Sequence, residues 1–195
     1  MIMDLNDDNV NQIIIEEKLE LCVVSYGGCG SNSLVKGLSS NGINCTTGSW
    51  HALLCHCPRK VNMIIPMIYI YRDPVKAFLS MRRRGHGYYT VNQQKLSNNL
   101  LSNTSDENLL SLMISQFYSW TNQKSDNVLI LKYDELFSIG IEEKLEAFLN
   151  RKLMNFPIQY IAPFVDDDVV MNLNTQDKVL FNKYKKHIDH INLYQ

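Results

Sequence analysis

The chain has 195 residues, with 19 Lys or Arg against 20 Asp or Glu, a formal net charge of −1 and 45% hydrophobic residues. This length suits a single domain, 1–195, with a sizeable core, and leaves little room for a second. The balanced charge argues against a broad basic surface for nucleic acid, and no apolar stretch is long enough to span a bilayer. The N-terminus is acidic and lacks the apolar run of a signal peptide, so we expect a cytoplasmic protein with no membrane partner.

Strands and helices are predicted to alternate along the chain. Short apolar or β-branched runs predict strands over 19–26, 43–46, 66–71 and 127–132. Amphipathic patterns and capping residues predict helices over 31–40, 74–84, 104–120, 141–151 and 175–193. We therefore expect a three-layer α/β fold in which a central parallel sheet of about four to five strands lies between helices.

Three of the predicted helix ends carry recognisable capping residues. Asp73 is a good N-cap, and Pro74 is a preferred first helical residue. Asn41-Gly42 is an ordinary left-handed stop for the helix over 31–40. Thr104-Ser105-Asp106-Glu107 is typical of a capping box.

The most informative segment joins the first predicted strand to the first predicted helix. It reads Gly27-Gly28-Cys29-Gly30-Ser31-Asn32-Ser33. A strand, a turn of backbone N–H groups and the positive end of a helix dipole together attract phosphate or sulfate. The other interpretation is a glycine-rich turn that only lets strand and helix pack closely. The segment lacks the Lys-Ser/Thr pair of a Walker A motif and the third glycine of a dinucleotide-binding GxGxxG motif.

Three further segments follow in chain order. They are His56-Cys57-Pro58, Tyr71-Arg72-Asp73-Pro74 with Ser80 eight residues after Arg72, and Leu131-Lys132-Tyr133-Asp134-Glu135-Leu136. With the glycine segment, and over about two-thirds of the chain from Leu21 to Leu149, this set resembles the sulfotransferase family that uses 3′-phosphoadenosine 5′-phosphosulfate (PAPS).

The resemblance implies a P-loop-like sulfotransferase fold with PAPS as the sulfuryl donor and no metal. The backbone of 27–33, with the hydroxyls of Ser31 and Ser33, would hold the 5′-phosphosulfate. Arg72 and Ser80 would grip the 3′-phosphate, a task that suits a planar guanidinium.

The resemblance also assigns the remaining two segments. Tyr133 would lie by the adenosine. His56 would be the general base, because an imidazole titrates near neutral pH. The acceptor would be a hydroxyl or amine on a small molecule or glycan.

The chain departs from that family at two places. Gly28 stands where the family usually carries a Lys or Arg beside the transferred group. The C-terminal part has no Arg-Lys-Gly segment for the 3′-phosphate. Candidate substitutes are Lys36, Arg59 and Lys60 for the first cation, and Lys183, Lys185 and Lys186 for the second. Two alternatives therefore stay open: a protein that binds PAPS, or its product 3′-phosphoadenosine 5′-phosphate (PAP), without catalysis, and a P-loop-type small-molecule kinase.

Several of these residues also have ordinary structural interpretations. His56 also fits a loop or core histidine, with His51 as the fallback base. Ser80 also fits a helix-surface serine, and Tyr133 also fits simple packing. The basic segment 82–87, which includes His86, suits either a solvated helix end or an anionic acceptor. The loops 47–60 and 85–103 are expected to form the acceptor pocket.

All five cysteines lie between Cys22 and Cys57, and we expect them to be reduced thiols. A metal site made by His51, Cys55, His56 and Cys57 is disfavoured. Its two thiolates lack the usual gap of two to four residues, and no second Cys pair follows.

Overall fold

The computed structural model describes residues 7–45, 55–57, 60–85, 105–122, 125–154, 156 and 173–194. The elements in these ranges are, in chain order, α1 (Asp7–Glu16), β1 (Cys22–Ser25), α2 (Ser31–Ser40), β2 (Met67–Tyr71), α4 (Pro74–Arg83), α6 (Asp106–Thr121), β3 (Val128–Lys132), the 3₁₀ helix η1 (Tyr133–Phe137), α7 (Ile141–Leu149), α9 (Thr175–Lys183) and α10 (Lys185–Leu193).

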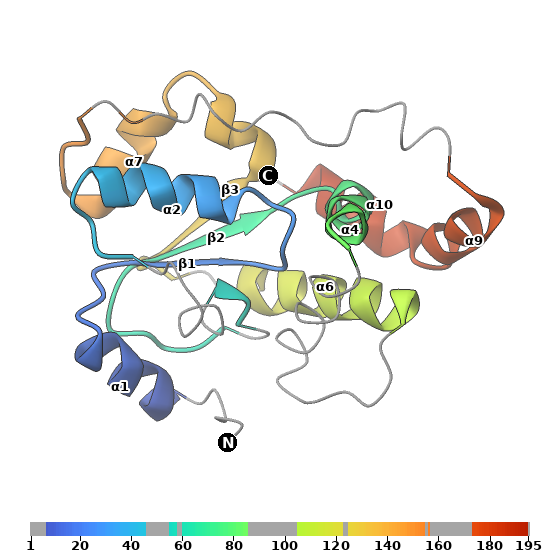
Figure 1. Ribbon diagram of the computed structural model, residues 1–195, viewed down its shortest axis with the longest axis horizontal. Coiled ribbons are helices and arrows are strands. Elements are labelled where there is room, and N and C mark those ends of the chain that lie inside the picture. The colour runs from blue at the N-terminus through green and yellow to red at the C-terminus, as the bar shows by residue number, and fades with distance from the viewer. Residues whose placement is uncertain are drawn as a thin grey trace.

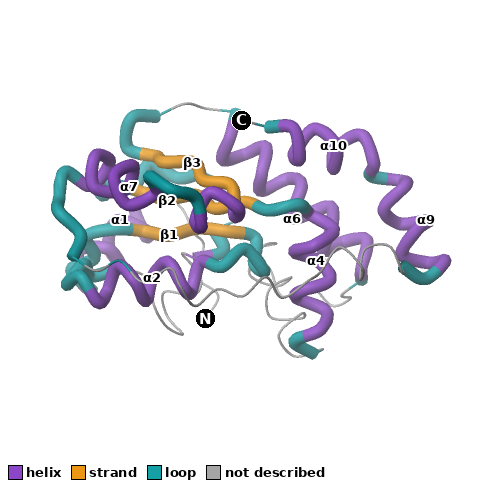
Figure 2. The backbone as a smooth tube through the Cα atoms, turned by 90° about the horizontal axis from the view of Figure 1, so that it is seen from above, coloured by secondary structure: helices purple, strands orange, loops and turns teal. Residues whose placement is uncertain are grey.

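The strands form a parallel sheet in the order β1-β2-β3, so that β2 lies in the middle (Figure 2). Val24 pairs with Tyr69, which pairs in turn with Ile130. Every residue of β1 and β2 is buried, as in a sheet covered on both faces. α2 covers one face and α6 the other, while α4 and α10 lie beyond the carboxyl end of β2 (Figure 1). The prediction of a parallel α/β sheet between helices is confirmed.

The predicted number of strands is not confirmed, because the described residues contain three. In the segment predicted as a strand at 43–46, the described pairing is a single parallel bridge between Cys45 and Leu21. The pairing stays short because the Asn44 backbone amide donates to the Glu20 carboxylate at 2.8 Å rather than to a backbone carbonyl of the neighbouring segment. Residue 46 lies outside the described ranges.

Two of the three predicted caps are confirmed. The Asp73 carboxylate accepts the amides of Val75 and Lys76 at 2.7 and 3.1 Å. Gly42 has φ 74°, the left-handed conformation expected after α2. The third prediction is wrong in its detail, because Ser105 is the N-cap of α6 and accepts the amide of Asn108.

The C-terminal helix predicted over 175–193 is two helices that meet at Tyr184. The Tyr184 hydroxyl donates to Glu107 at 3.2 Å, which holds the junction against α6. α9 then places Phe181 against Phe78 of α4, with ring centroids 5.5 Å apart. The helix α1 and the 3₁₀ helix η1 were not predicted.

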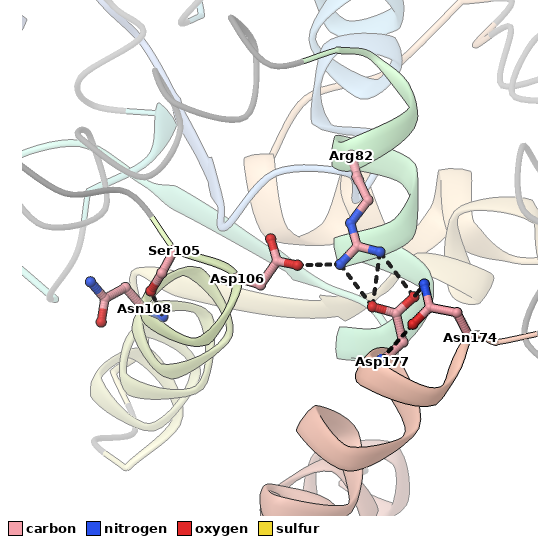
Figure 3. A network of polar contacts seen from close by, with 6 residues as sticks. All are labelled: Arg82, Ser105, Asp106, Asn108, Asn174 and Asp177. Carbon is pink, nitrogen blue, oxygen red and sulfur yellow. Dashed lines mark hydrogen bonds and ion pairs between the residues drawn. The ribbon is translucent and has the colours of Figure 1, made fainter.

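An ion-pair network fixes the last turn of α4 (Figure 3). The Arg82 guanidinium donates to both oxygens of Asp177 in α9 at 2.9 Å and also pairs with Asp106 of α6. The Asp177 side chain is 7% exposed and that of Arg82 33%. Arg82 is therefore committed to a structural role, which corrects its assignment to a solvated or acceptor-binding segment.

Replacing Arg82 by methionine is expected to lower the free energy of unfolding by about 2 kcal/mol. The substitution leaves the buried Asp177 carboxylate without its main partner, although the partial exposure of Arg82 reduces the effect. Urea denaturation followed by circular dichroism measures the change. The control is Lys178→Met, an exposed cation on α9, for which a change below about 0.5 kcal/mol is expected. Equal effects of Arg82→Met and Lys178→Met would contradict the role given to Arg82.

None of the helices in the described part of the chain is long and apolar enough to cross a membrane.

Candidate functional site

The glycine segment forms a tight turn between β1 and α2. Gly27, Gly28 and Gly30 have φ values of 96°, 67° and 75°, in the left-handed region that favours glycine. Gly30 is the N-cap of α2, and its carbonyl accepts the amides of Ser33 and Leu34. The turn thus leads directly into the positive end of the α2 dipole.

Consecutive backbone amides of this turn lack an acceptor among the described residues, although Gly28 and Cys29 themselves are buried. Within the described ranges, no protein acceptor binds the N–H groups of Gly28, Cys29, Gly30, Ser31 and Asn32. Such a row at a helix N-terminus is suited to an anion.

Two serines connect the turn to its own strand. The Ser25 hydroxyl donates to the Ser31 hydroxyl at 3.2 Å and accepts the Gly27 amide at 3.3 Å. Ser25 is fully buried, whereas Ser31 and Ser33 are half-buried and Asn32 is exposed. Ser31 and Ser33 therefore lie in the first turn of α2, and their contact with a 5′-phosphosulfate stays a prediction.

His56 lies at the beginning of the same turn. Its Nδ1 is 2.7 Å from the Ser25 carbonyl oxygen, which can only accept, so Nδ1 carries a proton. In the neutral ring Nε2 is then the atom without a proton and is able to take one. His56 is 9% exposed. The contact thus sets the tautomer of the ring, and the role of His56 as a general base stays a prediction.

The segment that carries His56 is held from α6. The carbonyl of Cys57 accepts hydrogen bonds from Gln116 Nε2 at 2.7 Å and from Trp120 Nε1 at 3.1 Å. These contacts were not predicted, because the helical pattern of α6 shows only which residues are buried.

Arg72 is buried against the glycine turn. The residue is only 5% exposed, and its Nη1 donates to the Gly28 carbonyl at 3.3 Å. The guanidinium carbon lies 4.1 Å from the centroid of the Tyr133 ring. Arg72 Nε is buried without a hydrogen-bond partner, and no described carboxylate pairs with this guanidinium.

Tyr26 fixes the backbone of Arg72, a role that sequence reasoning missed. Its hydroxyl accepts the Arg72 amide at 2.8 Å and donates to the Arg72 carbonyl. Complete burial raises the pKa of Tyr26, so the hydroxyl keeps its proton. The sequence did contain a signal for this role: a tyrosine, whose hydroxyl needs a hydrogen-bond partner when buried, directly after an apolar strand.

Tyr133 closes the other side of the turn. A Cβ atom on Gly30 would lie 2.9 Å from Tyr133 Cε2, so the ring packs directly on the glycine. Burial raises the pKa of Tyr133, while the charges of Arg72 and Arg84 oppose that shift. The structure thus brings Tyr133, Arg72 and the turn together.

Ser80 does not join this cluster through a hydrogen bond. It is 2% exposed in α4, one turn after Ala77. In the described structure no hydrogen bond links its hydroxyl to Arg72. The shared grip of Arg72 and Ser80 on a 3′-phosphate stays a prediction.

Gly28 is required by the packing of α4. A Cβ atom at this position would lie 2.6 Å from the carbonyl oxygen of Ala77. Its left-handed φ adds strain for any other residue. A Lys or Arg therefore does not fit at position 28 in this arrangement of turn and helix.

No family model, curated protein or solved structure matches the chain. The chemistry of the site is therefore inferred from its own residues.

The cations proposed as substitutes lie mostly outside the cluster. Lys36 is exposed on α2, and the backbone amide of Lys60 donates to Ser119. Lys183 pairs with Glu107, and Lys185 pairs with Asp189 at 2.7 Å on its own helix. Lys186 is exposed on α10, and Arg59, His51 and His86 lie outside the described residues.

Cys29 contributes a neutral thiol to the turn. Burial raises its pKa, and the sulfur donates to the Gly27 carbonyl at 3.1 Å. It is therefore unsuited to act as a thiolate nucleophile at neutral pH. All five cysteines are free, and no group of three or more His, Cys, Asp or Glu side chains in the described ranges is placed to hold a metal.

Proposed function

We propose that this protein is a PAPS-dependent sulfotransferase, which moves a sulfuryl group from PAPS to a hydroxyl or amine of a small molecule or glycan. The observation that carries the proposal is the buried Arg72 guanidinium beside the free amides of the glycine turn. A buried charge is normally paired. Here an anionic ligand would be the partner, with Arg72 Nε as a donor to it.

The proposed donor site has a P-loop-like strand, turn and helix. The amides of 28–32 and the hydroxyls of Ser31 and Ser33 hold the 5′-phosphosulfate. Arg72 and Ser80 hold the 3′-phosphate, and Tyr133 lies by the adenosine. The bridge between Leu21 and Cys45 supports a fourth strand beside β1, within a sheet of about four to five strands. The free cysteines support a cytoplasmic location.

In the proposed reaction the acceptor oxygen or nitrogen forms a bond to sulfur as the bond from sulfur to the 5′-phosphate oxygen breaks. The electron pair of the broken bond leaves with PAP, and the acceptor proton passes to His56 Nε2. Positioning and fixed donors supply most of the rate enhancement, because charge spreads over the sulfuryl oxygens as in phosphoryl transfer.

Arg72→Ala is expected to weaken the binding of PAP by roughly 30-fold or more, because it removes a buried, charge-assisted donor. Isothermal titration calorimetry measures the affinity, and circular dichroism checks the fold. Arg72→Lys keeps the charge but loses the planar fork, so an intermediate loss is expected. Arg151→Ala is the control, since Arg151 pairs with Glu20 at 3.3 Å and contacts no residue of the turn.

Two outcomes would contradict this proposal. PAP binding that is unchanged in Arg72→Ala would remove Arg72 from the site. Preference for ATP with magnesium over PAP would favour the small-molecule kinase.

A second candidate is a protein that binds PAP or PAPS without catalysis. The close contact between Gly28 and Ala77 favours it, since the turn itself has no room for a cation beside the transferred group. Transfer of labelled sulfate from PAPS to any member of a broad acceptor panel supports the enzyme. PAP binding without any transfer supports the second candidate.

A further inference from the structure

The C-terminal end of α10 is bonded to both chain neighbours of Arg72. The Tyr71 hydroxyl donates to the Tyr194 carbonyl at 2.7 Å, and Asn192 Nδ2 donates to Asp73 Oδ2 at 2.9 Å. These bonds join segments that are far apart in the chain, since α10 lies with α4 beyond the carboxyl end of β2 (Figure 1). Arg72 therefore lies between two residues that the C-terminal helix holds.

Asp73 links α10 to the start of α4. As the N-cap of α4, its Oδ1 accepts the amides of Val75 and Lys76, and its Oδ2 accepts Asn192 Nδ2. Both carboxylate oxygens are therefore bonded, which fixes the orientation of this side chain toward the helix. Because Asp73 directly follows Arg72, the same bonds restrict the backbone where the chain leaves β2 for α4.

Asn192 is itself held by a neighbouring strand. Lys132 Nζ, at the end of β3, donates to the Asn192 carbonyl at 2.8 Å. A cation at the last carbonyls of a helix also complements the helix dipole. The Tyr194 ring packs edge-on against the rings of Tyr71 and Phe117, with centroids 5.8 and 5.3 Å away. The end of α10 is thus held in place by contacts other than the bond that the Asn192 side chain makes.

The side-chain amide of Asn192 has one bonded atom and one unbonded atom. Its Nδ2 faces the Asp73 carboxylate, whereas its Oδ1 is buried and has no hydrogen-bond partner among the described residues. A buried acceptor without a donor costs stability. Local stability alone therefore does not explain an amide at this position. What the amide provides is the bond to Asp73, next to Arg72.

Tyr26 and α10 restrain Arg72 from the two sides of β2. Tyr26, which follows β1, bonds the Arg72 amide at 2.8 Å and also the Arg72 carbonyl. The end of α10, which Lys132 holds to β3, bonds the side chains on either side of Arg72. These contacts fix the backbone from which the guanidinium extends to the Gly28 carbonyl.

We infer that Asn192 is a positioning residue of the nucleotide site, which acts on the ligand through Asp73 and Arg72. By holding Asp73, its amide fixes the backbone that carries the Arg72 guanidinium beside the glycine turn. This inference rests on the proposed function, in which Arg72 binds the 3′-phosphate of PAP or PAPS. A guanidinium that is already in place loses less conformational freedom when the phosphate binds, so the affinity is higher.

The test is a double-mutant cycle of Asn192→Ala with Arg72→Ala. Calorimetry measures the affinity for PAP and for adenosine 5′-phosphate, which lacks the 3′-phosphate, and circular dichroism checks the fold. Asn192→Ala is expected to weaken PAP binding about fivefold and to leave the binding of adenosine 5′-phosphate unchanged, because it disturbs only the group at the 3′ end. In the Arg72→Ala background the same substitution is expected to cause no further loss. Asn192→Gln keeps an amide donor and is expected to recover part of the affinity for PAP.

Tyr118→Phe is the matched control for Asn192→Ala. It removes another hydrogen bond of α10, between Tyr118 and His187 at 3.1 Å, and is expected to change neither affinity. Equal losses for the two ligands in Asn192→Ala would show a general loosening of the fold and overturn the inference, as would a loss of the same size in the Arg72→Ala background. Unchanged PAP binding in Asn192→Ala would also overturn it and leave the proposed function standing. Absence of PAP binding in the unaltered protein would reject the proposed function and the inference together.

Discussion

Replacing Gly28 by alanine is expected to lower the free energy of unfolding by about 3 to 4 kcal/mol. The left-handed φ of 67° contributes about 1–2 kcal/mol of that loss. The contact of the new methyl group with the Ala77 carbonyl, at 2.6 Å, contributes about 1–3 kcal/mol, because neither backbone gives way easily. Thermal unfolding should show a fall in Tm of roughly 10 °C for a chain of this size.

Gly140→Ala is the matched control for Gly28→Ala. Gly140 also has a positive φ, 91°, but the nearest atom to its added Cβ is a flexible Glu143 oxygen at 3.9 Å. Only the backbone strain of about 1–2 kcal/mol is then expected. Gly28→Lys is expected to be at least as unstable as Gly28→Ala and to gain no transferase activity. A Gly28→Lys protein as stable as the unaltered one would show that α4 does not pack against the turn at position 28.

Trp120→Ala is expected to lower the free energy of unfolding by about 3–5 kcal/mol. Trp120 is fully buried, and its ring stacks on Tyr69 with centroids 5.4 Å apart and an interplanar angle of 7°. The truncation leaves a cavity under β2 and removes a donor to the Cys57 carbonyl. Chemical denaturation in urea measures the change.

Trp120→Phe separates the two contributions of this side chain. It keeps an aromatic ring on Tyr69 but loses the hydrogen bond, and Gln116 still donates to the same carbonyl. A loss of about 1–2 kcal/mol is therefore expected. If Trp120→Ala were no less stable than Trp120→Phe, the result would contradict the packing of Trp120 of α6 on Tyr69 of β2.

Local signals in the sequence predicted much of the fold. Asp73 caps α4 as expected because capping involves only neighbouring backbone groups. The break at Tyr184 was not predicted, and the side-chain contact at this junction is a long-range one, from the Tyr184 hydroxyl to Glu107, 77 residues away. The short pairing at Cys45 likewise depends on a contact outside its own segment, the bond from the Asn44 backbone amide to the Glu20 carboxylate.

The sequence drew attention to the segments that meet at the glycine turn, but not to how they are arranged there. The left-handed glycines follow from residue type, because few other residues adopt these angles. The burial of Arg72 depends on Tyr26 and Tyr133, which come from two other segments. From the sequence, Gly28 was interpreted as the absence of a cation. The structure shows that glycine is also required there by packing, because α4 lies against position 28.

The double hydrogen bond of Tyr26 has a consequence for how the site would respond to a ligand. One hydroxyl engages both backbone polar groups of Arg72, so the ends of two adjacent strands are clamped together. An incoming anion would then find the arginine backbone already set, and only side-chain rotamers would adjust. Such preorganisation reduces the conformational entropy lost on association and leaves more of the interaction energy for affinity.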